Sequence, residues 1–109
     1  MEPCFNLWIE HRGVVVLSEW RVNLLEAIEA TGSISAAAEK MEVTYHRAWE
    51  KVHEMEEGLD TKLIDAQTGG VGGGGATLTS KGKELIKKFR SFDNGLAELI
   101  ERRFHSAFN

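Results

Sequence analysis

The stretch that most constrains the fold is residues 31–57, with the sequence TGSISAAAEKMEVTYHRAWEKVHEMEE. Near its start, Gly32 can take the left-handed backbone conformation that closes a preceding helix. Ser33 or Ser35 can then begin the next helix, because a serine oxygen at this point accepts a hydrogen bond from a free backbone N–H. Three alanines at 36–38 have almost no side chain to keep neighbours away. These residues predict a short helix that another helix crosses closely.

A very short turn separates this helix from a third one. Only Glu42 and Val43 precede Thr44, whose side chain can cap a following helix. In that helix an apolar stripe at i, i+4 and i+7 is formed by Ala48, Val52 and Met55. Many such turns have glycine in place of Glu42, and a non-glycine residue at positive φ costs about 1 kcal/mol. Two helices joined in this way form the helix-turn-helix motif of DNA-binding proteins.

The remaining faces of the third helix are polar. They present donors and acceptors, as a helix that reads base edges requires; these residues are Thr44, His46, Arg47, Glu50, Lys51 and His53. Amphipathic helices with short turns also occur in three-helix bundles that have no DNA function. The alanine-rich helix, the minimal turn and the arginine on the third helix together favour the DNA-binding motif.

The overall charge is less favourable for DNA binding. The net charge of −4 opposes association with a polyanion, because lysine and arginine contacts to phosphates supply much of DNA affinity. The charge is uneven, however: acidic residues gather in 54–65, and five basic residues lie between Thr79 and Arg90, namely Lys81, Lys83, Lys87, Lys88 and Arg90. A basic helix face could approach a phosphate backbone, although a solvated lysine-rich helix explains the run equally well.

Length and composition predict one folded domain. The 109 residues are too few to add a separate sensor domain, and 42% hydrophobic with 28% charged residues is typical of a globular protein. Cys4 is the single cysteine, so no disulfide can form within the chain. We find neither a signal peptide nor an apolar stretch long enough for a bilayer. We therefore expect a cytoplasmic protein without membrane contact.

The segment before the motif predicts a small β-hairpin and one helix. Residues 5–17, FNLWIEHRGVVVL, hold β-formers on both sides of a polar break with Gly13. Ser18 can cap a first helix, whose packing stripe consists of Leu24, Leu25 and Ile28. We expect Trp8 and Trp20 in the core or at a dimer contact.

A glycine-rich stretch after the motif predicts a wing. Within residues 59–79, short strands at 62–65 and 76–78 can pair around a glycine tip. Exposed N–H groups at such a tip can come close to a sugar–phosphate backbone.

The chain gives no convincing catalytic or nucleotide-binding pattern. Gly70, Gly72 and Gly75 have the spacing of a dinucleotide-binding fingerprint. Such a fingerprint must be followed directly by a helix, whereas these glycines are followed by a strand-like stretch. Glu84 follows Gly82 and Lys83 where a phosphate loop needs serine or threonine. His46 and His53 lie seven residues apart without a carboxylate or cysteine at a convincing ligand spacing. We expect no enzyme activity, no cofactor and no metal.

The C-terminal part predicts a long dimerisation helix over residues 80–109. Thr79 can cap this helix. Apolar residues then follow at spacings of four, three, four and three and form a coiled-coil-like seam, namely Leu85, Phe89, Phe92, Leu96 and Leu99, with Ile100 beside it. A two-fold partner helix would bury this stripe, and the alternative is that it packs back on the first hairpin. A homodimer would hold two recognition helices about one duplex turn apart, on a palindromic site in double-stranded DNA.

The amino-terminal winged helix-turn-helix domain of the ModE family is similar to two runs of this chain, LLEAIEATGSISAAAEKMEVTYHRAWEKVHEMEE and TGGVGGGGATLTSKGKELI. This family comprises molybdate-responsive transcriptional regulators, and its domain resembles the LysR-type DNA-binding domain. The resemblance covers residues 24–89 and implies a homodimer with its third helix in the major groove and its wing on the backbone. With the polar residues above, the predicted DNA contacts are Ser35, Thr44, Tyr45, His46, Arg47, Glu50, Lys51, Thr68, Gly69, Gly70, Gly72, Gly73 and Lys81.

Two departures from the family limit what the resemblance implies. Full-length members continue into a molybdate-binding domain, so we expect no molybdate or tungstate binding within this chain. The family tends to have basic wing residues where this chain has Ala66 and Val71, which weakens phosphate contacts.

We predict an α+β, mainly α, winged helix-turn-helix in a single domain: hairpin 1–17, three-helix core 18–58, wing 59–79 and dimer helix 80–109. Its predicted function is that of a stand-alone, sequence-specific transcriptional regulator. The alternative is a dimeric interaction module that has lost DNA reading and pairs with a separate oxyanion sensor.

Overall fold

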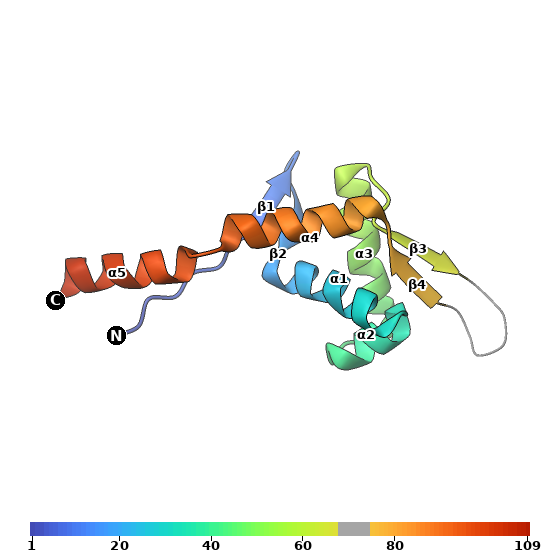
Figure 1. Cartoon of the computed structure of the whole chain (residues 1–109), viewed down its shortest axis with the longest axis horizontal. Helices are drawn as coiled ribbons and strands as arrows, with labels where there is room; N and C mark the ends of the chain where they lie inside the picture. The colour runs from blue at the N-terminus through green and yellow to red at the C-terminus, as the bar shows by residue number, and fades with distance from the viewer. Residues whose placement is uncertain (68–74) are drawn as a thin grey trace.

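The computed structural model describes residues 1–67 and 75–109, which form a helical core with a hairpin, a wing and a helical arm projecting from it (Figure 1). Its elements in chain order are β1 (Trp8–His11), β2 (Val14–Ser18), α1 (Glu19–Thr31), α2 (Ile34–Lys40), α3 (Tyr45–Leu59), β3 (Ile64–Gln67), β4 (Gly75–Leu78), α4 (Ser80–Asp93) and α5 (Leu96–Phe108). Strands β1 and β2 pair antiparallel, as do β3 and β4. This order confirms the predicted winged helix-turn-helix. Within the described ranges, no helix has the length and apolarity needed to cross a membrane.

The core helices begin where a side chain caps them. The hydroxyl oxygens of Ser18, Ser33 and Thr44 each accept a hydrogen bond from a backbone N–H three residues later, at 3.2, 2.9 and 3.1 Å. Ser33 rather than Ser35 is therefore the cap of α2. Helix α1 ends at Gly32, whose φ of +81° is the left-handed conformation expected there.

The turn between α2 and α3 has a positive φ at the position where many such turns have glycine. Glu42 has a φ of +59°, which costs a non-glycine residue about 1 kcal/mol. The N–H of Val43 holds the turn by donating to the Ala38 carbonyl at 3.0 Å. Ala37 and Ala38 are buried, and α2 contacts both α1 and α3.

One apolar core joins the helices to the wing and to α4. The predicted stripes of α1 and α3 are buried in it, namely Leu24, Leu25, Ile28, Ala48, Val52 and Met55. Leu63 before β3, Leu78 of β4 and Phe89 of α4 belong to the same cluster. Trp20 packs against this cluster, whereas Trp8 on β1 is 48% exposed. The base of the wing is thus fixed relative to α3.

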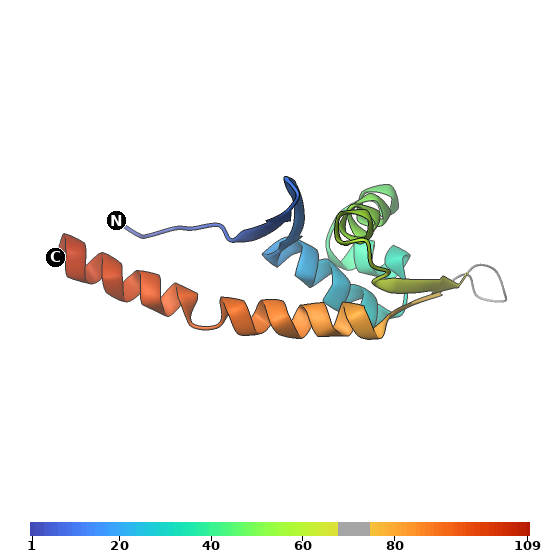
Figure 2. The same ribbon diagram turned by 90° about the horizontal axis from the view of Figure 1, so that it is seen from above.

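Helix α4 lies along α1 (Figure 2) and is held there by a glycine and an arginine. A Cβ atom at Gly82 would lie less than 3.0 Å from the Leu63 carbonyl oxygen, so only glycine permits this approach. Further along α4, Arg90 donates hydrogen bonds to α1 side chains, namely Glu19, Asn23 and Glu26. The Glu26 contact contributes most to raising the pKa of Arg90 above its ordinary value.

The C-terminal helix is interrupted, whereas the sequence predicted one continuous helix over residues 80–109. Helix α4 ends at Asp93, Asn94 is extended, and Gly95 has a φ of +81°, so α5 begins anew at Leu96. Helix α5 extends away from the core (Figure 2), and none of its residues is buried.

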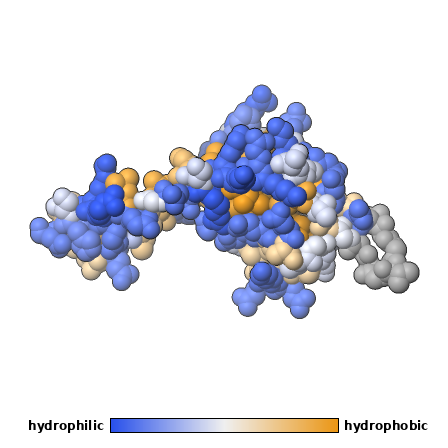
Figure 3. All heavy atoms as spheres, viewed as in Figure 1, coloured by the Kyte–Doolittle hydropathy of each residue, from blue (hydrophilic) through white to orange (hydrophobic). Residues whose placement is uncertain are grey.

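The interruption and the packing of α4 divide the predicted dimer seam. Phe89 is 2% exposed and lies inside the core, so its assignment to a dimer contact is wrong. Leu85 also packs partly against the core. Phe92, by contrast, is 54% exposed, and Figure 3 shows hydrophobic residues gathered where the arm leaves the core.

Candidate nucleic-acid interface

The first turns of α3 present their polar side chains to solvent. The exposed residues there are Tyr45, His46, Arg47, Trp49 and Glu50, on the sides of the helix away from the buried Ala48. Thr44 fixes the first turn because its hydroxyl oxygen accepts from the Arg47 N–H. Ser35, at the start of α2, is exposed as well. The predicted contacts in the first turns of α3 and at Ser35 are therefore accessible to a large ligand.

Lys51, another predicted contact, takes part in an ion-pair network with α1. Its Nζ lies 3.2 Å from Glu54, which also accepts from Arg21 of α1 at 3.1 Å, and the Lys51 side chain is only 20% exposed. Burial opposes the charge of Glu54, but the hydrogen bonds from Arg21 and Lys51 outweigh it and hold the pKa of this carboxyl below its ordinary value. Arg21 thus joins α1 to α3 through Glu54, and Lys51 pairs with the same carboxylate rather than projecting freely.

Three aromatic rings line up along the outer side of α3. Trp49 and His53 stack with ring centroids 3.8 Å apart, and His46 is aligned with Trp49 at 6.4 Å. The His53 Nδ1 lies 2.8 Å from the Trp49 carbonyl oxygen. His46 also lies 3.5 Å from the Glu50 carboxylate. Two of these rings belong to the first turns, where the polar contacts are.

The wing is anchored at its base to both α1 and α3. The N–H of Ala76 donates to the Gly32 carbonyl at 2.7 Å. The Glu56 carboxylate accepts hydrogen bonds from the N–H groups of Leu63 and Ile64 at 2.8 and 3.2 Å. Strand β3 begins at Ile64, two residues later than expected. The predicted tip contacts lie outside the described residues: Thr68, Gly69, Gly70, Gly72 and Gly73.

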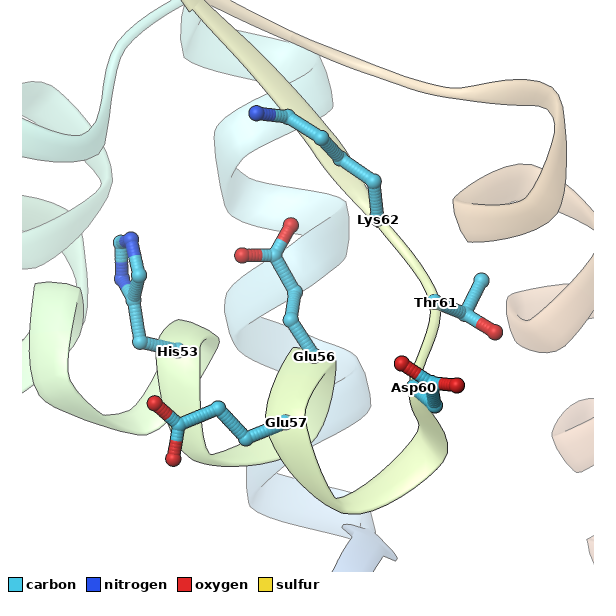
Figure 4. Close-up of a pocket in the computed structure, with 6 residues that line it drawn as sticks. All are labelled: His53, Glu56, Glu57, Asp60, Thr61 and Lys62. Carbon is cyan, nitrogen blue, oxygen red and sulfur yellow. The ribbon is translucent and has the colours of Figure 1, made fainter.

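An acidic pocket borders the surface at the far end of α3. It measures about 270 Å³ and is lined by His53, Glu56, Glu57, Asp60, Thr61 and Lys62 (Figure 4). Three carboxylates repel phosphates, so an approaching duplex would be confined to the N-terminal half of α3. No group of three or more histidine, cysteine or acidic residues in the described part of the chain is arranged to hold a metal ion.

Helix α4 adds positive charge beside the wing. Lys81, the predicted contact there, is exposed but lies 3.6 Å from Glu84, which also pairs with Lys88 at 3.0 Å. The Lys88 hydrogen bond, followed by the charges of both lysines, lowers the pKa of Glu84. Lys83 and Lys87 are also exposed, so this part of α4 keeps a net positive charge.

Residues 21–83, from α1 to the start of α4, match the family model of the bacterial regulatory helix-turn-helix proteins of the lysR family. The chain belongs to this family. In this LysR-family domain the matched residues run from α1 through the helix-turn-helix and the wing strands to the start of α4.

The curated relatives of this LysR-family chain include ModE regulators, which confirms the resemblance seen in the sequence. The molybdenum-pterin-binding protein MopB of Rhodobacter capsulatus is 41% identical over 95 residues, covering 82% of this chain and 35% of MopB. The DNA-binding transcriptional dual regulator ModE of Escherichia coli (strain K12) is 41% identical over 84 residues, covering 77% of this chain and 30% of ModE. The chain thus spans about a third of the length of these relatives.

Two solved structures share the fold. The structure of the CbnR_DBD–DNA complex has a TM-score of 0.62 at 19% identity, covering 82% of this chain and 98% of that one. ArgP from Mycobacterium tuberculosis has a TM-score of 0.53 at 22% identity, covering 75% of this chain and 30% of that one.

Two features of the surface were not assigned from the sequence. The Arg21 contact to Glu54 joins residues 33 positions apart, and no local pattern signals it. Trp49 could have been recognised, because it directly follows Ala48 of the buried stripe and therefore lies off that stripe.

Proposed function

We propose that this chain is the DNA-reading domain of a homodimeric transcriptional regulator that binds a palindromic duplex site. The observation that carries this proposal is the exposed first turns of α3, held on a rigid core and bordered by the wing. The similarity to regulators named as DNA-binding supports gene regulation as the purpose. Such a protein would act in the cytoplasm, where bacterial DNA lies.

In the proposed complex, α3 enters the major groove with its N-terminal end. The groove is about 12 Å wide and admits an α-helix. Arg47 is exposed and has no ion pair among the described residues, so its guanidinium is available for a guanine edge or a phosphate. The wing and the exposed lysines of α4 would lie along the sugar–phosphate backbone and supply the non-specific part of the affinity.

In the proposed dimer, the arm packs against the arm of a second copy. Helix α5 has no buried residue, and one of its sides bears Leu96, Leu99, Ile100 and Phe104. Phe92 and Phe108 are 54% and 65% exposed. Contact between two copies would remove this apolar surface from water, at roughly 25 cal/mol for each Å² buried. The dimer would also double the number of phosphate contacts.

The test is a selection of binding sequences from random duplexes at low salt, followed by affinity measurements between about 50 and 200 mM salt. We expect a half-site repeated at a spacing of about one duplex turn. Arg47→Ala should weaken binding by about 5- to 150-fold, the effect of about 1–3 kcal/mol for a base contact. Arg12→Ala is the matched control, because Arg12 is an exposed arginine in the turn between β1 and β2.

A selection that enriches no duplex, or an Arg47→Ala variant with unchanged affinity, would contradict this proposal or its recognition helix. Affinity that does not fall with added salt would instead favour an interaction module. Molybdate and tungstate are included in parallel selections, and we expect no effect of either on binding by this chain.

A further inference from the structure

We propose that Trp49 reads the 5-methyl group of a thymine in the major groove, with His53 holding its ring in position. This inference rests on the proposed function, because it assigns one specificity contact within the same interface. It begins from the position of one tryptophan: Trp49 is 41% exposed on the helix that would enter the groove.

Core packing does not explain this tryptophan. Successive residues on an α-helix are turned by about 100°, so Trp49 is turned well away from Ala48, which is fully buried. Trp49 belongs neither to the apolar core nor to the half-buried residues that pack against it. Tryptophan is enriched at binding interfaces, because it joins a large apolar ring to a polar N–H group.

The ring of Trp49 is held in one orientation before any ligand binds. His53 stacks on it at 3.8 Å with 25° between the ring planes. The Trp49 carbonyl can only accept, so the His53 Nδ1 must carry the hydrogen that joins them at 2.8 Å. The His46 ring lies 6.4 Å from that of Trp49 and is 14° from parallel to it. A ring already ordered in this way loses little side-chain entropy on binding.

The chemistry of the major groove determines what such a ring can contact. Base faces are stacked inside a duplex, so only base edges are accessible, and the thymine methyl is the apolar group on those edges. His53, the stacking partner of Trp49, lines the pocket with Lys62 at the start of the wing (Figure 4). On the helix that would enter the groove, an exposed indole ring would therefore meet the edge of a base pair.

The experiment starts from the duplex selected by the wild-type protein, in which each thymine is replaced in turn by uracil. Uracil pairs in the same way but lacks the 5-methyl group. We expect one thymine in each half-site at which uracil weakens wild-type binding by about fourfold, the factor that burial of one methyl group supplies. Trp49→Ala should bind the thymine and uracil duplexes equally, and Trp49→Phe should keep part of the preference.

The controls separate this contact from a loss of structure. Trp8→Ala removes a tryptophan of similar exposure on β1 and should keep the full preference for thymine. His53→Ala leaves the indole in place but removes its stacking partner, and should reduce the preference. If Trp49→Ala binds too weakly to measure, the Trp49→Phe ratio decides the question.

The outcomes distinguish this inference from the proposed function. Specific wild-type binding with equal affinity for thymine and uracil at every position overturns the inference alone. A preference for thymine that Trp49→Ala retains also overturns it, and would leave a protein partner as the use of the exposed ring. If the wild-type protein binds no duplex at all, the proposed function fails and the inference with it.

Discussion

Gly82→Ala should destabilise the fold, although alanine is the better helix former. The added methyl group would lie less than 3.0 Å from the Leu63 carbonyl oxygen, whereas ordinary contact begins at 3.4 Å. That carbonyl cannot move away easily. It accepts from the Thr79 N–H at 2.9 Å, and the Leu63 N–H donates to Glu56. The substitution must therefore push α4 away from the start of the wing.

The magnitude follows from two opposing effects. Overpacking of this kind costs about 1–3 kcal/mol, while replacing glycine by alanine in a helix gains up to about 1 kcal/mol. Because the clash is with backbone rather than a flexible side chain, the cost should be about 2–3 kcal/mol. The net loss should then be about 1–2 kcal/mol, which lowers the thermal midpoint by about 4–10 °C in a chain of this size.

The assay is thermal and urea unfolding, followed by far-UV circular dichroism and tryptophan fluorescence at a fixed protein concentration. Lys83→Ala is the matched control, because Lys83 is exposed on the same turn of α4 and an alanine there meets no backbone. This substitution should change the free energy of unfolding by less than about 0.5 kcal/mol. A Gly82→Ala variant as stable as the wild type, or more stable, would refute the argument that close packing requires glycine here.

Three further predictions concern acid stability, the motif turn and the arm. The pKa of Glu54 is lowered in the folded protein, so its charged form adds to the free energy of unfolding above the ordinary value of 4.5. This contribution is lost as the pH falls through the lower folded value. Glu54→Gln should remove this part of the acid dependence of the urea midpoint between pH 7 and pH values below 4.5. Glu42→Val should unfold at least about 1 kcal/mol more easily than Glu42→Gly, because a β-branched residue is strained at positive φ, and equal urea midpoints would contradict this. Leu99→Asp should give monomers in sedimentation equilibrium and weaken duplex binding, whereas His105→Asp, on the opposite side of α5, should leave the dimer intact.

Local features of the sequence determined the secondary structure of the motif. Ser18, Thr44 and Thr79 cap their helices because a side-chain oxygen and the N–H groups that it meets lie within three residues of each other. The cost of a non-glycine residue at positive φ in the turn also followed from the sequence, and the structure shows that Glu42 takes this conformation. The buried stripes of α1 and α3 followed from helical periodicity alone.

The tertiary structure alone decided which surface covers each apolar stripe. Periodicity shows that one side of a helix is apolar but not which neighbour packs on it, so Phe89 was assigned to a dimer seam although it fills the core of its own chain. Lys51 was expected at the DNA, but it pairs with Glu54, whose carboxylate also accepts from Arg21 in another helix. The need for glycine at position 82 likewise arises from the Leu63 carbonyl, 19 residues earlier in the sequence. Contacts between distant residues depend on how the elements pack in three dimensions, and no spacing along the chain records that.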